Sequence, residues 1–170
     1  MTEHRSLEEL AKEAEALWNE YGPRHESGEL KNKNRREIPQ QDMPSQDPAV
    51  RRKNQAEVAL GYTQFQAQVE ALRCLQCKNA PCIAGCPVSI DIPRFVGLAA
   101  EAKFQESVDA IKESSLLPAI CGRVCPQESQ CMLECTVGKI AKDRMQSVAI
   151  GRIERFVSDL ERDRGAIEPP

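Results

Sequence analysis

The sequence is poor in aromatic residues, histidine and net charge, and each shortage narrows the possible functions. Phe, Trp and Tyr make up only 4% of the 170 residues, so large aromatic side chains do not dominate the core. The formal net charge is −3 at pH 7, whereas domains that bind nucleic acid are usually basic. The two histidines, His4 and His25, have no evident partner for acid–base or nucleophilic chemistry. We therefore expect no nucleic-acid partner and no catalytic centre in this chain.

Long apolar runs and nucleotide-binding motifs are also missing. No apolar run approaches the roughly 18 residues that a membrane-spanning helix needs. The opening MTEHRSLEEL lacks the apolar stretch of a secretory signal, so we predict a cytoplasmic protein without a membrane span. Neither a G-x-G-x-x-G motif nor a P-loop occurs, and the chain therefore offers no recognisable site for a dinucleotide or nucleoside triphosphate.

Cysteine, by contrast, is abundant and clustered. The first group is RCLQCKNAPCIAGCP and the second is CGRVCPQESQCMLEC. Thiols in the cytosol are kept reduced, so clustered cysteines there indicate metal binding or redox chemistry rather than disulfides. The eight cysteines are Cys74, Cys77, Cys82, Cys86, Cys121, Cys125, Cys131 and Cys135.

The spacing of the cysteines separates zinc from iron–sulfur clusters. Structural zinc favours two close pairs separated by a finger-length spacer; Cys74 and Cys77 could form one pair, but no matching second pair follows at that distance. In iron–sulfur proteins a tight run of cysteines holds one cluster, and a cysteine that precedes proline can ligate the other. Each group contains one Cys-Pro pair, at residues 86–87 and 125–126. The spacing therefore favours two neighbouring, cross-ligated 4Fe–4S clusters.

The Cys-Pro pairs also predict local backbone structure. Proline lacks a backbone N–H and disfavours helix at the residue before it, so the chain should turn where that thiol is presented. The first cysteine group, C-x2-C-x4-C-x3-C-P, differs from the bacterial ferredoxin spacing C-x2-C-x2-C-x3-C-P. This difference argues against the small β-rich ferredoxin fold. Spacing alone would make all eight thiolates ligands, Cys121 included.

The remaining sequence predicts an all-α protein, because no convincing alternating strand pattern occurs. Capping boxes at Ser6/Glu9 and Thr63/Gln66 begin two helices, and Gly22-Pro23 is expected to end the first. Two short helices follow in residues 90–118, and the last helix covers about 146–161. We expect an N-terminal docking helix (1–22), an extended polar arm that is a solvated linker (23–53), a helical ferredoxin-like domain with two clusters (54–163) and a C-terminal tail (164–170).

Several motifs in order resemble a known family. They are NQAEVALGYTQFQAQVEALRCLQCKNAPCIAGCPVSIDIPRFV, CGRVCPQESQC and SVAIGRIERFVSDL. Residues 36–163 resemble the N-terminal iron–sulfur domain of the bacterial glutamate synthase small-subunit family. The same domain occurs in dihydropyrimidine dehydrogenase and in the large subunit of NADH-dependent ferredoxin:NADP oxidoreductase. The resemblance implies a helical domain with two 4Fe–4S clusters that passes electrons between flavin sites.

The resemblance also implies a ligand set that spacing alone does not give. The first cluster would take Cys74, Cys77, Cys82 and Cys135. The second would take Cys86, Cys125 and Cys131, with Glu154 of the segment AIGRIERF at the position where the family carries Gln or Glu. Cys121 would then not be a ligand.

By this resemblance the chain is an electron-transfer subunit that needs partner proteins. FAD and NAD(P)H are expected only on a partner chain, a flavoprotein oxidoreductase subunit, and an amidotransferase-type large subunit is a further candidate partner. A structural or assembly module whose metal only stabilises the fold is the alternative, and a regulator with oxygen-sensitive clusters is a third hypothesis. The chain is expected to be a separate subunit rather than a fragment of a longer one.

Overall fold

The structure is a computed structural model and describes residues 4–165. Across these residues all regular structure is helical, and the one strand-like feature is an isolated bridge between Ser45 and Ala59. In chain order the elements are α1 (Leu7–Glu26), α2 (Asn32–Arg35), α3 (Pro48–Arg51), α4 (Gln64–Leu72), α5 (Pro81–Ala84), α6 (Ile92–Ala100), α7 (Phe104–Lys112), α8 (Pro118–Val124), η1 (Gln127–Ser129), α9 (Cys131–Glu134), α10 (Thr136–Ala141), η2 (Arg144–Gln146) and α11 (Ile150–Asp163). The prediction of a helical protein is confirmed.

Helix α1 begins as the sequence predicts but ends later. The Ser6 side chain accepts from the Glu9 amide, and the Glu9 side chain accepts from the Ser6 amide, which completes the capping box. The expected stop at Gly22-Pro23 is wrong, because the helix continues through Pro23 to Glu26. Proline inside a helix costs about 3 kcal/mol. The packing of α1 on α4 offsets that cost: Leu10 and Ala14 are buried, and Trp18 stacks on Phe65 with ring centroids 6.3 Å apart.

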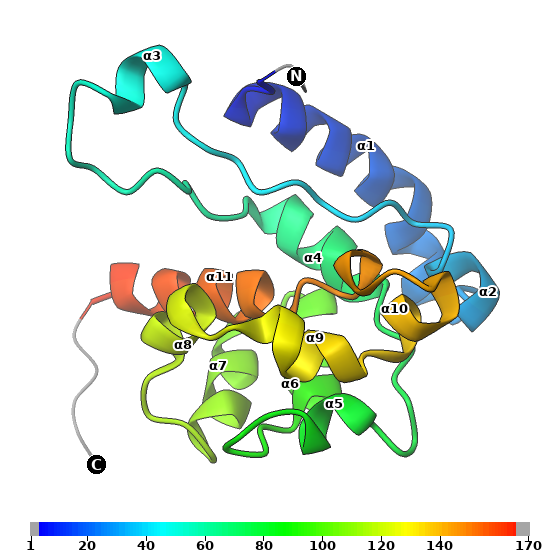
Figure 1. Cartoon of the computed structure of the whole chain (residues 1–170). Coiled ribbons are helices and arrows are strands. Elements are labelled where there is room, and N and C mark those ends of the chain that lie inside the picture. The colour runs from blue at the N-terminus through cyan, green and yellow to red at the C-terminus, as the bar shows by residue number, and fades with distance from the viewer. Residues whose placement is uncertain (1–3, 166–170) are drawn as a thin grey trace.

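The segment predicted to be a solvated arm, residues 23–53, is mostly exposed but is anchored to the rest of the protein by a few buried residues. It contains the last turn of α1 and all of α2 and α3. Leu30 and Ile38 belong to the main hydrophobic core, and Gln41 is also buried. In Figure 1 the chain leaves α2 and returns beside α1 and α4 toward α3. Most of this segment is therefore exposed, as a linker would be, but these residues hold its path against the core.

The core lies between α4, α6, α7 and α11, with α8 packed along α11. Helix α4 is fully enclosed from Gln66 to Leu72, and its Thr63/Gln66 capping box is present as predicted. The rings of Phe104 and Phe156 meet edge to face at 5.2 Å, which joins α7 to α11. In the part of the chain that the structure describes, no helix is both long and apolar enough to cross a bilayer.

The last helix begins later than the sequence predicts. The expected start near Gln146 falls in the turn η2, and α11 runs from Ile150 to Asp163. The backbone of Ser147 is extended, with ψ of 159°, and the amide of Ala149 donates to the buried Glu70 carboxylate at 2.8 Å. This side-chain contact holds residues 147–149 outside the helix. Of the predicted C-terminal tail, residues 166–170 lie outside the described part of the chain.

Candidate metal centres

Four thiols surround one small cavity, and from here on they are called the first group; the second group is Cys86, Cys125, Cys131 and Glu154. Cys74, Cys77, Cys82 and Cys135 all line it, together with apolar side chains that include Val137 and Val148. These four cysteines come from three places: the loop after α4, the single turn α5, and the junction of α9 and α10. The structure thus brings together the four residues that the resemblance assigns to one cluster.

Local backbone geometry presents these thiols. Helix α4 ends at Leu72, and Gln76 has a left-handed φ of 50°, which folds the Cys74–Cys77 loop tightly. The Gln76 amide donates toward the Cys74 sulfur and lowers its pKa, but burial outweighs that effect and raises the pKa to about 11. Burial, then the neighbouring thiols, raise the pKa of Cys82 to about 12. Thiolates are therefore unfavourable in this cavity unless a bound cation compensates them.

The second group combines three thiols with a carboxylate. Burial comes first among the causes that raise the pKa of Cys131 to about 12, and the nearby Cys86 and Glu154 follow. Burial also leads in raising the pKa of Cys125 to about 11, followed by Cys121, Glu154 and Cys86. Cys86 from the first cysteine motif and Glu154 from α11 thus both lie near Cys125 and Cys131 of the second motif.

Glu154 is the residue whose surroundings most clearly indicate a binding role. Its side chain lies inside the domain, where the residue is only 6% exposed. Within residues 4–165, its Oε1 has no hydrogen-bond partner. Burial raises its pKa to about 7. Buried polar groups normally have partners, and a buried carboxylate needs a cation or donors, so a metal-containing group among these side chains would satisfy it.

Two glycines allow the close approaches that form the second group. A Cβ on Gly122 of α8 would lie 2.7 Å from the Arg155 nitrogen, so α8 rests directly on the backbone of α11. A Cβ on Gly85 would lie 2.9 Å from the Gln130 carbonyl oxygen, where the loop after α5 meets the segment before α9. Side chains at these positions would move Cys125 away from Glu154, and Cys86 away from Cys131.

The expected turn before proline occurs at Cys125. Helix α8 ends at Val124, and Cys125 is extended with φ −62° and ψ 135°. Cys86 lies at a bend directly after α5. Over the described part of the chain, no three His, Cys, Asp or Glu side chains meet tightly enough for a single metal ion; the first four thiols instead stand around a space.

Cys121 also lies near the second group. It is on α8 four residues before Cys125, and its sulfur is 3.8 Å from the Ser115 hydroxyl. Its thiol is among the neighbours that raise the pKa of Cys125. The structure therefore places both Glu154 and Cys121 beside Cys125.

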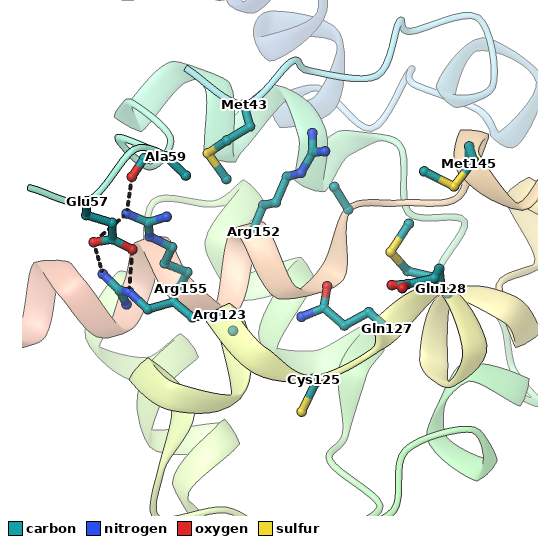
Figure 2. A pocket seen from close by; sticks show the side chains of 13 residues that line it. Met43, Glu57, Ala59, Arg123, Cys125, Gln127, Glu128, Met145, Arg152 and Arg155 are labelled. Atoms are coloured by element: carbon teal, nitrogen blue, oxygen red, sulfur yellow. Dashed lines mark hydrogen bonds and ion pairs between the residues drawn. The ribbon is translucent and has the colours of Figure 1, made fainter. Parts of the chain in front are cut away.

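Arginines flank the outer side of the second group. Figure 2 shows a pocket that Cys125 lines together with Arg123 of α8 and Arg152 and Arg155 of α11. Glu57 pairs with Arg123 at 3.0 Å and with Arg155 at 3.2 Å. These ion pairs join the segment before α4 to the α8–α11 contact.

Several charged residues that the sequence did not mark as functional lie beside the first group. Glu70 and Arg73 on and after α4 form a buried ion pair, and Arg35 of α2 donates to the carbonyl oxygens of Leu72 and Cys74 at 2.8 and 3.4 Å. His25, for which the sequence shows no partner, is partly buried against Arg35. No sequence pattern marked these residues, because charged side chains are usually exposed and their partners here are distant in the sequence.

Comparison with known proteins identifies the family of this chain. The family model described as dihydropyrimidine dehydrogenase domain II, 4Fe-4S cluster, matches residues 51–166. The chain belongs to this family. The resemblance found in the sequence is confirmed, and the chain is a 4Fe–4S domain of the kind found in oxidoreductases.

Its curated relatives are parts of oxidoreductases. The glutamate synthase (NADPH) small chain of Azospirillum brasilense is 34% identical over 130 residues, which are 76% of this chain and 26% of that protein. The corresponding small chain of Escherichia coli (strain K12) is 35% identical over 124 residues, 73% of this chain and 25% of that protein. The NAD-dependent dihydropyrimidine dehydrogenase subunit PreT of the same organism is 36% identical over 109 residues, 64% of this chain and 26% of that protein. The chain thus spans about a quarter of the length of these relatives.

Proposed function

We propose that this chain binds two 4Fe–4S clusters and relays single electrons between flavin or cluster sites of an NAD(P)H-dependent oxidoreductase. The main support is the pairing of two ligand groups: four thiols around one cavity, and three thiols beside the unpartnered carboxylate of Glu154. Each group contains cysteines from both motifs of the sequence.

The proposed ligands of the first cluster are Cys74, Cys77, Cys82 and Cys135. Those of the second are Cys86, Cys125, Cys131 and Glu154. Glu154 is preferred to Cys121 because its buried Oε1 lacks a hydrogen-bond partner in the described structure, whereas the Cys121 thiol contacts the Ser115 hydroxyl. A carboxylate carries the same single negative charge as a thiolate but differs from it in donor atom and donor strength, so the two clusters would differ in reduction potential.

When bound, such clusters accept and release one electron at a time. The chain's own residues supply the ligands, exclude water with the apolar lining, and hold the two sites next to each other. FAD and NAD(P)H would bind to a partner chain, as expected for a glutamate-synthase-like or bifurcating complex. An amidotransferase-type large subunit is the partner that this proposal favours in the first case, and the cytoplasm is the proposed location.

Anaerobic purification tests the proposal directly. The expected product is brown, contains about eight iron and eight sulfide per chain, and bleaches reversibly when dithionite and then ferricyanide are added. Electron paramagnetic resonance of the reduced protein should resolve two centres. A folded, colourless protein with stoichiometric zinc would contradict the relay and favour a structural metal module. A copurifying flavoprotein that reduces the protein from NADPH would identify the partner.

A further inference from the structure

We infer that Arg35 tunes the reduction potential of the first cluster by placing a fixed positive charge beside Cys74. This inference rests on the proposed function, because it requires a cluster at the first site. Arg35 lies in the segment that the sequence alone assigns to a solvated linker. The structure instead turns its guanidinium toward the end of α4, where the chain enters the cysteine loop.

The contacts of Arg35 are with the backbone at the end of α4 and at the start of the cysteine loop. Its Nη1 donates to the Leu72 carbonyl at 2.8 Å and to the Cys74 carbonyl at 3.4 Å. These contacts cross 37 and 39 residues of sequence, so the position of Arg35 depends on how the N-terminal segment packs. The last carbonyls of a helix lack partners within the helix, and Arg35 supplies one to Leu72.

His25 positions the guanidinium. Its Nδ1 lies 3.3 Å from Nη2 of Arg35, and both residues are partly buried. Burial, followed by the Arg35 charge, lowers the His25 pKa, which the carboxylates of Glu101 and Glu26 oppose. A neutral ring can accept the hydrogen bond from Arg35, whereas a protonated ring would repel it. His25 therefore supports one orientation of Arg35 near neutral pH.

A half-buried cation at this place should act on the cluster more than a surface cation would. Water and salt screen interactions between exposed charges, but they screen partly buried charges much less. One electron added to the cluster makes it more negative, so a fixed positive charge stabilises the reduced form more than the oxidised form. Cluster potentials respond to local charge and to burial in this way. Removing the charge should therefore lower the potential of the first cluster.

A helix cap without electrostatic influence is the simpler role for the same contacts. Loss of a cap would reduce stability but would leave the potential unchanged. The two roles can be separated because the second cluster serves as an internal reference, and because Arg36, the next residue, is exposed. Arg36→Gln removes the same charge from the same segment without a contact to the cysteine loop.

The test is a redox titration of the full-length, cluster-loaded protein with dithionite, monitored by electron paramagnetic resonance. Arg35→Gln should weaken reduction of one centre about tenfold, which is a shift of about −59 mV for a one-electron couple. The other centre and the Arg36→Gln protein should not change. Arg35→Lys, which keeps the charge but not the planar fork, should retain most of the potential. If Arg35→Gln loses iron, Arg35→Met replaces it, because it also removes the charge but keeps the apolar stem. It should show the same shift in potential.

The possible results are distinct. Two clusters whose potentials are the same in Arg35→Gln, Arg35→Met and wild type would overturn this inference and leave the proposed relay intact. Equal shifts in Arg35→Gln and Arg36→Gln would also overturn it, since the effect would then be one of general surface charge. A wild-type protein without two clusters would overturn both proposals.

Discussion

The carboxylate of Glu70 lies 2.5 Å from Nη1 of Arg73, and both side chains are buried inside the domain. Glu70 also accepts from the amides of Gln41 and Ala149, each at 2.8 Å. Arg73 donates to three carbonyl oxygens, those of Ile38 at 3.2 Å, Gln146 at 2.6 Å and Ser147 at 3.1 Å. One ion pair thus joins the N-terminal segment, the residue next to Cys74, and the start of the helix that carries Glu154.

Removing one member of this ion pair should be costly. Glu70→Gln leaves the Arg73 charge buried without its counter-ion, and changes of that kind typically cost about 3–5 kcal/mol. Urea unfolding of the loaded protein should show this loss. The matched control is Glu113→Gln, which breaks the exposed pair with Arg94 at 2.7 Å and should cost at most about 1 kcal/mol. Similar losses in the two variants would show that the buried pair has no special role.

Glu154 and Cys121 compete for the last place in the second site, and substitution should separate them. Glu154→Ala should abolish or alter one of the two paramagnetic centres and lower the iron content, because it removes a proposed ligand. Cys121→Ser should leave both centres and the iron content unchanged. Electron paramagnetic resonance spectra and an iron assay decide between the two residues. Loss of a centre in Cys121→Ser but not in Glu154→Ala would assign the last ligand position to Cys121.

The pH dependence of the cluster-free protein should report the burial of Glu154. Burial raises its pKa from 4.5 to about 7, so between these values the folded state holds a proton that the unfolded state has released. The stabilising contribution is complete below about pH 4.5 and is lost as the pH rises through about 7. The free energy of unfolding should fall by about 3 kcal/mol over this range.

Urea unfolding of chelator-treated protein from pH 4.5 to about 7, the window of that shift, measures this effect. Glu154→Gln serves as the control, because a neutral side chain cannot titrate and the slope should largely disappear. An unchanged slope in Glu154→Gln would mean that other groups cause the pH dependence.

Gly122→Ala should disturb the second site more than the first. The added methyl would lie 2.7 Å from the Arg155 nitrogen and 2.9 Å from the Gly151 carbonyl oxygen, and helix backbone cannot yield as a side chain can. Overpacking of this kind costs about 1–3 kcal/mol. Thermal unfolding and the spectrum of the second centre test this.

Gly97→Ala is the matched control for that substitution. Its methyl would meet only the end of the flexible Gln76 side chain, at 3.3 Å, so stability should change little. Equal effects of the two substitutions would show that the contact between α8 and α11 tolerates a side chain.

The sequence predicted the features that depend on local patterns. Thr63 with Gln66 begins α4 as a capping box, and a chain turn occurs at Cys125 before its proline. The helical class and the family followed from periodicity and from the cysteine motifs.

Features that depend on tertiary packing were missed. Pro23 normally ends a helix, but the contact between α1 and α4 carries the helix past it. Leu30 and Ile38 are isolated apolar residues in a polar segment, so no periodic pattern marks them as core. Glu70 resembles a solvated helix residue, and only the folded chain brings the donors of Gln41 and Ala149 to it. The position of Arg35 beside Cys74 has the same origin.

Helix α9 contains a single turn, with Cys131 at its first residue and Cys135 just beyond its end. These neighbours along the chain face different ligand groups, as do Cys82 and Cys86 on either side of the end of α5. Dividing the polypeptide anywhere between residues 87 and 120 would therefore leave neither fragment with a complete set of either group. Under the proposed ligand assignment, a designer who wanted a one-cluster miniature of this domain could not obtain it by truncation, and would have to change the order in which the chain visits the two sites.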